Sequence, residues 1–197
     1  MSPETHLLAS WIIAAKTTNN PRDCRLVTLA GILPDLDGSG IVWDLGRELL
    51  GLPSTSLYAT YHHWLLHGIF GGLAISGALA AFGREKWRVA ALAFLVFHLH
   101  LLCDLVGSRG PEITDLWPIY YLGPFSRSGM VIWAGQWRLD SWINRYITVA
   151  LFLYSIWLPL KLGHSVVGVF NRRADAIFVG VLRKWQQALL TRIGRAA

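Results

Sequence analysis

Three apolar segments that are long enough to cross a lipid bilayer constrain the fold of this chain most. They are Leu65–Phe82, Val89–Val106 and roughly Tyr146–Gly163, each close to the ~17–20 residues that a membrane span requires. The composition agrees, because 53% of the 197 residues are hydrophobic and only 15% are charged, which is unusual for a soluble domain. The sequence therefore predicts an integral membrane protein.

Two shorter apolar runs, His6–Ala15 and Leu26–Leu33, precede these spans. Each is too short to cross a bilayer alone, and the polar stretch Lys16–Arg25 separates them. They predict a hairpin of short helices that dips into the membrane or packs as partial spans on the other helices. No linker or internal repeat divides the chain. We therefore expect an all-α, membrane-embedded helical bundle over residues 1–170, with about three full spans.

The last segment, residues 171–197, has a different pattern. Ile177, Val181, Trp185 and Leu189 recur at near-helical spacing among Arg and Lys, which predicts a basic amphipathic helix on an anionic membrane surface. Nucleic-acid binding is the rival interpretation of this basic segment. The sequence contains no nucleic-acid-binding motif, so we expect membrane lipid, and not nucleic acid, as the partner.

The distribution of Lys and Arg orients the helices. We suppose that the chain reverses at Lys16–Arg25 and at Gly83–Arg88, and that the tail after Lys161 lies on the same side. Then 13 of the 18 basic residues share one face: Lys16, Arg22, Arg25, Arg84, Lys86, Arg88, Lys161, Arg172, Arg173, Arg183, Lys184, Arg192 and Arg195. Basic residues accumulate on the cytoplasmic side. We expect a multi-pass inner (plasma) membrane protein with a cytoplasmic C-terminus.

Histidines and aspartates gather at the opposite face, towards the periplasm or cell exterior. His100 and Asp104 are one helical turn apart near the end of a span, so they can bind the same metal ion. A charged group within a span costs at least ~2.5–3.5 kcal/mol and normally has a partner or a function. Further candidates from distant parts of the chain reach the same face: His6, Asp35, Asp37, His62, His63 and His67. We expect His6, Asp35, His67, His100 and Asp104 to surround a common volume a few ångströms across.

Each carboxylate also has a purely structural explanation. Asp35 and Asp37 follow Pro34, where Asp is a common turn residue. His100 and Asp104 can form a buried hydrogen-bonded pair without any metal. Together these explanations weaken, because a hydrophobic chain has no structural reason to bring so many imidazoles and carboxylates to one face.

The central histidines leave an alternative open. His62, His63 and His67 are also explained as interfacial histidines without a metal. His63 and His67 share a face of a continuous helix, whereas His62 joins them only at or before the helix cap. The ligand pair is therefore either His62 with His67 or His63 with His67. We expect His98, on another helix face, and His164, at the basic end, to be non-ligands.

The order of these elements carries a family resemblance. The elements are Thr5-His6, Leu33-Pro34-Asp35-Leu36-Asp37, His62-x4-His67, His100-x3-Asp104 and Trp117-Pro118. Over roughly residues 5–125, this order resembles the YdjM-like family of membrane-bound, metal-dependent hydrolases. The chain departs from the family pattern where His63-Trp64 and Gly68 replace an Arg-Gly and a Ser. More remotely, the His-x3-Asp helix is similar to that of zinc-dependent phospholipase C.

The resemblance implies a metal-dependent hydrolase. The implied metal ligands are His6, Asp35, His62, His67, His100 and Asp104. Such a set suits Zn²⁺, or Mn²⁺ if oxygen ligands dominate. Asp35 and Asp37 are the implied catalytic residues, which bridge metals or accept the proton of the attacking water. Because the site lies at the bilayer boundary, the expected substrate is a lipid or a lipid-linked (phospho)ester.

The segment from Gly107 to Asn144 is rich in aromatic residues, including Trp117. We expect it to lie on the membrane surface and cover the site, although an aromatic belt without substrate contact explains it equally. Arg109 and Arg127, near the same face, are candidates for phosphate binding or for headgroup anchoring.

Two other classes of function stay open. A non-catalytic scaffold or regulatory protein with a structural metal would have a coordinatively closed site. A small metal or proton transporter would have polar residues that continue across the spans. The sequence disfavours the transporter, because Leu65–Phe82 and Tyr146–Gly163 contain few polar residues.

Overall fold

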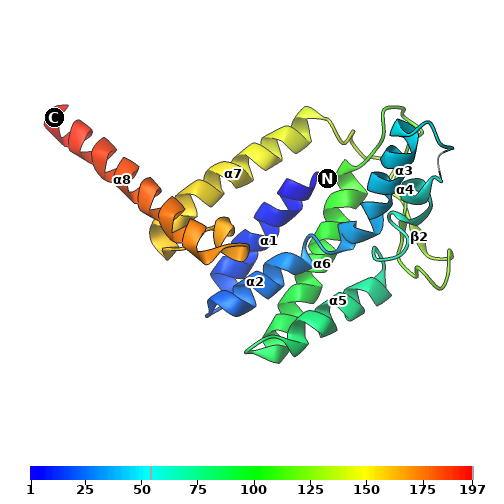
Figure 1. Cartoon of the computed structure of the whole chain (residues 1–197), viewed down its shortest axis with the longest axis horizontal. Coiled ribbons are helices and arrows are strands. Elements are labelled where there is room, and N and C mark those ends of the chain that lie inside the picture. Colours follow the sequence, from blue (N-terminus) through cyan, green and yellow to red (C-terminus); the bar gives the residue numbers. More distant parts are fainter. Residues whose placement is uncertain (54, 197) are drawn as a thin grey trace.

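The computed structural model describes residues 1–53 and 55–196, and its described part is almost entirely helical (Figure 1). The helices are α1 (Pro3–Thr17), α2 (Pro21–Ala30), η1 (Pro34–Ser39), α3 (Gly40–Leu49), α4 (Leu57–Tyr61), α5 (Ile69–Ala81), α6 (Lys86–Gly107), α7 (Trp142–Leu162), η2 (Val166–Val169) and α8 (Arg172–Ala196), where η marks a 3₁₀ helix. Two short antiparallel strands, β1 (Ile119–Tyr120) and β2 (Met130–Val131), lie between α6 and α7. The expected all-α membrane bundle is confirmed.

Two helices, α6 and α7, are long and apolar enough to cross a membrane. A third candidate is formed by α2 together with Pro34–Leu49, which meet at an angle of 55° and count as one span if the bent pair is continuous. The helices α1 and α2 form the expected N-terminal hairpin, and Asn20 caps α2 by accepting a hydrogen bond from the backbone N–H of Asp23 (3.0 Å). The helices α6 and α7 contain the expected spans Val89–Val106 and Tyr146–Gly163, and the total reaches the expected three if the bent pair is counted, but the third span is a different segment from the expected one.

The expected full span Leu65–Phe82 is corrected. Its helix, α5, has only 13 residues, about 20 Å at 1.5 Å per residue, whereas the hydrocarbon core is about 30 Å thick. The four residues before α5 form a turn instead. There the backbone N–H of Leu66 donates to Asp37 (3.0 Å), and that of Ile69 donates to the carbonyl of Tyr121 (2.8 Å). These hydrogen bonds fix the backbone before Ile69 in a non-helical conformation, so α5 begins only at Ile69.

The core lies where α1, α2, α5 and α6 meet. Trp11, Val27, Val89 and Val96 are fully buried there. A Cβ atom on Gly72 would lie 2.9 Å from the ring of Phe97, so the glycine allows α5 to approach α6 closely. The helices α5 and α6 lie side by side, and α1 and α2 cover α6 from another side (Figure 1).

Hydrogen bonds join the basic segments at one end of this bundle. The Asp23 carboxylate accepts from the backbone N–H groups of Arg84 (2.8 Å) and Glu85 (3.0 Å) in the turn before α6. The Arg25 Nε donates to the carbonyl of Gly168 (2.7 Å), after α7. Both chain reversals and the start of the tail after α7 therefore lie together, as the orientation argument supposes.

The helix α8 extends away from the bundle (Figure 1). Its first half packs through Val179 and Leu182, which are buried. Further along, Trp185, Leu189 and Ile193 are exposed apolar residues, as on a helix that lies on a membrane. Residue 197, at the end of the expected C-terminal segment 171–197, lies outside the described residues.

We predict that Asp23→Ala lowers the free energy of unfolding by about 1–3 kcal/mol, because it leaves backbone donors near the turn before α6 without their acceptor. Unfolding of the detergent-solubilised protein in denaturant measures the effect. The matched control is Asp140→Ala, which removes an exposed ion pair with Arg138 and should have little effect. Equal destabilisation by both variants would contradict this role of Asp23.

Candidate metal centre

Four side chains from three parts of the chain bring one ligand atom each to within 4.8 Å of one another. They are Asp35 from η1, His67 from the turn before α5, and His100 and Asp104 from α6. The His100 Nε2 lies 3.0 Å from Asp104 Oδ2, 3.1 Å from His67 Nε2 and 3.5 Å from Asp35 Oδ1. Tetrahedral ligands with metal bonds of ~2.0–2.2 Å are about 3.3–3.6 Å apart, so these spacings fit one metal ion.

The outer nitrogens of the two histidines fix which ring atoms face the cluster. The His100 Nδ1 donates to the carbonyl of Gly31 (2.8 Å), and the His67 Nδ1 donates to Asp37 Oδ2 (2.9 Å). A neutral imidazole has a single N–H, so if both rings were neutral each Nε2 would present a lone pair to the other at 3.1 Å. A proton or a metal ion between the two Nε2 atoms removes this repulsion. Hydrogen-bond partners on the outer nitrogen of metal-binding histidines commonly fix the same tautomer.

The carboxylates favour positive charge at this point. Burial by itself lowers the pKa of His67, but hydrogen bonding to the carboxylates of Asp104 and Asp37 outweighs burial and raises the pKa to about 9. The Asp104 carboxylate is 2% exposed and contacts His6, His67 and His100. Thus a buried negative charge faces two imidazole nitrogens, as a cation site requires.

Asp37 lies behind His67 and not in the cluster. Its Oδ1 accepts from His62 Nδ1 (2.9 Å), and its Oδ2 accepts from His67 Nδ1 and the backbone N–H of Leu66. Both oxygens of this buried carboxylate are therefore engaged in orienting its neighbours. The expected catalytic role of Asp37 stays a prediction.

The structure also separates the central histidines. His67 belongs to the four-residue cluster, whereas the expected ligand His62 is bonded to Asp37 and groups only with His63 and His67. The His63 Nε2 is closer to the cluster, 3.8 Å from Asp104 Oδ2. The backbone of His63 has a left-handed φ of 65°, which is uncommon outside glycine and clusters at functional sites. Burial, followed by the charge of His67, lowers the pKa of His63, so its ring is neutral.

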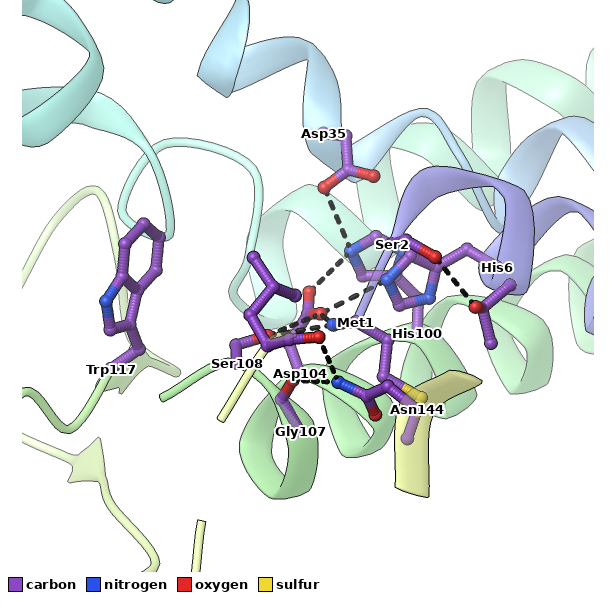
Figure 2. Close-up of polar contacts among 12 residues, drawn as sticks. Met1, Ser2, His6, Asp35, His100, Asp104, Gly107, Ser108, Trp117 and Asn144 are labelled. Carbon is purple, nitrogen blue, oxygen red and sulfur yellow. Dashed lines mark hydrogen bonds and ion pairs between the residues drawn. The ribbon is translucent and has the colours of Figure 1, made fainter. Parts of the chain in front are cut away.

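His6 contacts the cluster from outside. Its Nε2 donates to Asp104 Oδ1 (3.1 Å), and its ring centroid lies 3.9 Å from that of His100 (Figure 2). The Asp104 Oδ1 also contacts the α-amino group of Met1 and the Ser108 hydroxyl. His6 thus binds the second oxygen of Asp104, and it does not belong to the four-residue cluster.

A cavity of about 290 Å³ opens beside the cluster. Its lining includes Asp35, Tyr58, His63, Asp104 and Trp117. Figure 2 shows Asp35 pointing towards His100 and Trp117 standing apart from the cluster. Burial, followed by the charges of Asp35 and Asp104, raises the pKa of Tyr58 to about 12, so its phenol stays protonated. The site is therefore reached from a cavity that the aromatic segment after α6 helps to line.

The remaining candidates point elsewhere. Arg109 donates to the carbonyls of Gln136 and Glu112, and Arg127 lies over the rings of Trp64 and Tyr120. Neither arginine lines the cavity beside the cluster. Neither His98 nor His164 belongs to a group of potential ligands among the described residues.

Sequence reasoning missed two contributors. Tyr58 precedes His62 by one helical turn, and this spacing could have predicted that the two side chains lie on the same face. The carbonyl of Gly31 gives no signal in the sequence, because any residue supplies the same atom.

A family model described as YdjM inner membrane protein matches residues 1–180 of this chain. No curated protein and no solved structure matches it. The comparisons thus agree with the family resemblance and add nothing to the more remote likeness to phospholipase C.

We predict that His100→Ala lowers the affinity for a divalent metal by more than the ~10–100-fold that loss of an outer-shell partner causes. Elemental analysis of the detergent-purified protein measures the bound metal. His98→Ala is the matched control. It removes an imidazole from the same helix, but this imidazole bonds to Phe94 and Tyr121 and not to the cluster. Equal metal contents in the two variants would argue against this centre.

Proposed function

We propose that this chain, which belongs to the YdjM inner membrane protein family, is a membrane-bound, metal-dependent hydrolase. The observation that carries the proposal is a buried four-residue cluster with a cavity on one side. A structural metal site is closed by its protein ligands, whereas a catalytic site keeps a position for water or substrate. The cavity therefore favours catalysis over a structural metal.

His67, His100 and Asp104 would hold the metal, and Asp35, which lines the cavity, would stand beside a fourth position that is left to water or substrate. Two imidazoles and one carboxylate suit Zn²⁺, with Mn²⁺ as the second choice. A bound metal supplies Lewis acidity, which polarises a phosphoryl or carbonyl oxygen and makes water more acidic. Asp37 and the carbonyl of Gly31 hold the two imidazoles in the required tautomers.

Asp35 is the proposed proton acceptor. Its Oδ1 faces the cluster, 3.5 Å from His100 Nε2, while its Oδ2 is buried with no hydrogen-bond partner among the described residues. Because Asp35 lines the cavity and its Oδ1 faces the cluster, this carboxylate can accept the proton of a water that attacks a substrate there. Asp37 is proposed as a positioning residue, in place of the catalytic role expected from the sequence.

The proposed substrate is a lipid or a lipid-linked (phospho)ester at the membrane surface. Asp104 lies three residues before the end of α6, so the site is near the end of a membrane-spanning helix. Beside η1, the helix α3 exposes Val42, Trp43 and Leu49, which are 73%, 58% and 87% exposed. A helix with such an apolar surface suits contact with acyl chains. Membrane lipid is thus the proposed partner of both α3 and α8.

We predict that Asp35→Asn lowers turnover by about 100-fold or more at saturating metal, because general base catalysis contributes at least this factor. Asp37→Asn should instead raise the metal concentration required by about 10–100-fold, with turnover restored by excess metal. The assay is release of a phosphorylated headgroup or free acid from a panel of lipids with added Zn²⁺ or Mn²⁺.

The same assay of the wild-type protein decides whether the chain is a hydrolase or a non-catalytic scaffold. If the metal-loaded protein turns over no lipid class, and the Asp35 and Asp104 variants match it in metal content and stability, the hydrolase proposal fails in favour of a scaffold. Turnover that is insensitive to Asp35→Asn would reject the assigned proton acceptor alone.

We propose further that the metal centre faces the periplasm or cell exterior and that the C-terminus is cytoplasmic. The basic segments that meet around Asp23 and Gly168 lie at the other end of the bundle from Asp104. A reporter that fluoresces only in the cytoplasm should be active when it is fused after residue 197. Activity only of a reporter that requires export would reverse the orientation.

A further inference from the structure

A second cavity, of about 210 Å³, lies at the basic end of the bundle. It opens between α1, the start of α2 and the segment from the end of α7 into α8. Its lining includes Trp11, Cys24, Arg25, His164, Arg172 and Asp175. Because Asp104 and the metal centre lie at the opposite end of α6, this cavity is separate from the proposed active site.

The lining contains a buried donor with no hydrogen-bond partner among the described residues. Trp11 is fully buried, and its indole N–H has no hydrogen-bond partner within residues 1–53 and 55–196. A buried polar group without a partner costs about 1–3 kcal/mol, so natural proteins rarely retain one without a reason. Because Trp11 lines the cavity, a ligand bound there is one source of the missing acceptor.

The charges around the cavity specify the nature of that acceptor. The Nε of Arg25 donates to the carbonyl of Gly168, which holds the guanidinium group at the wall. Neither Arg25 nor Arg172 forms an ion pair with any residue that the structure describes. The single carboxylate of the lining, Asp175, has its Oδ1 occupied by the backbone N–H (2.8 Å) and hydroxyl (2.6 Å) of Ser165. Two guanidinium groups thus face the cavity against one carboxylate that is already engaged.

We propose that this cavity binds a phosphate group, either as free phosphate or as the headgroup phosphate of an anionic phospholipid. A phosphate offers several acceptor oxygens to the indole N–H, and its negative charge suits the two guanidinium groups, which are preferred phosphate binders. Trp11, Cys24 and Val169 give the rest of the lining an apolar character that suits the glycerol part of a lipid. The cavity lies at the basic end of the bundle, which the proposed orientation places at the cytoplasmic membrane surface.

Calorimetric titration of the detergent-purified full chain tests the proposal. One arm uses inorganic phosphate, and the other uses short-chain phosphatidylglycerol with phosphatidylcholine as the neutral reference. Arg172→Gln should weaken binding by about 10-fold or more, because it removes a charge-assisted hydrogen bond. Trp11→Phe, which keeps an aromatic ring but removes the N–H, should weaken binding by about 3–10-fold.

Arg173→Gln is the matched control, because Arg173 is the next residue of α8 and does not line the cavity. It should change affinity by less than about 2-fold. Binding in either arm that depends on Arg172 and Trp11 supports the site, and the arm that responds identifies free phosphate or lipid as its source. The proposal is overturned if neither probe binds, or if Arg172→Gln and Arg173→Gln have equal effects. Hydrolase activity does not enter this test.

Discussion

The buried carboxylate of Asp104 is the constraint on which the rest of the structure depends. It lies within a membrane-spanning helix, where an uncompensated charge is expensive. Its two oxygens are met from different directions, by His6 of α1 on one side and by His67 and His100 on the other. Compensation of one charge thus ties α1 and the turn before α5 to α6, and it also creates the cluster that can hold a metal.

The short helix α5 follows from the same constraint. His67 reaches Asp104 only because the chain leaves the helix before Ile69 and folds its polar groups around Asp37. An uninterrupted span from residue 65 would present His67 to the side of a helix, with no carboxylate behind it. The helix α5 is therefore short because the residues before it form the turn that orients His67. The left-handed backbone of His63 belongs to the same turn.

The sequence predicted those features of the site that depend on local periodicity. His100 and Asp104 share a face because α6 is regular, and their meeting with His6, Asp35 and His67 followed from placing the ends of helices at one membrane face. It could not predict features that depend on the path of irregular backbone. The interruption before α5, the position of Asp37 behind His67 and the carbonyl of Gly31 behind His100 all arise from turns that hydrophobicity does not encode.

The two ends of the bundle are coupled through single helices. Helix α2 begins with Asp23 and Arg25, which organise the basic end, and is followed by Gly31, which orients His100. A metal held by groups from the turn before α5 and from α6, with Asp35 of η1 beside it, would bind only the assembled bundle, and it would stabilise the folded chain by about 2.7 kcal/mol at a free metal concentration of 100 times its dissociation constant. A phosphate group at the other end, which would join α1, α2 and α8, stabilises the same assembly by the same linkage. The two proposed ligands, a cation and an anion, would therefore stabilise the same folded state from opposite ends of the bundle.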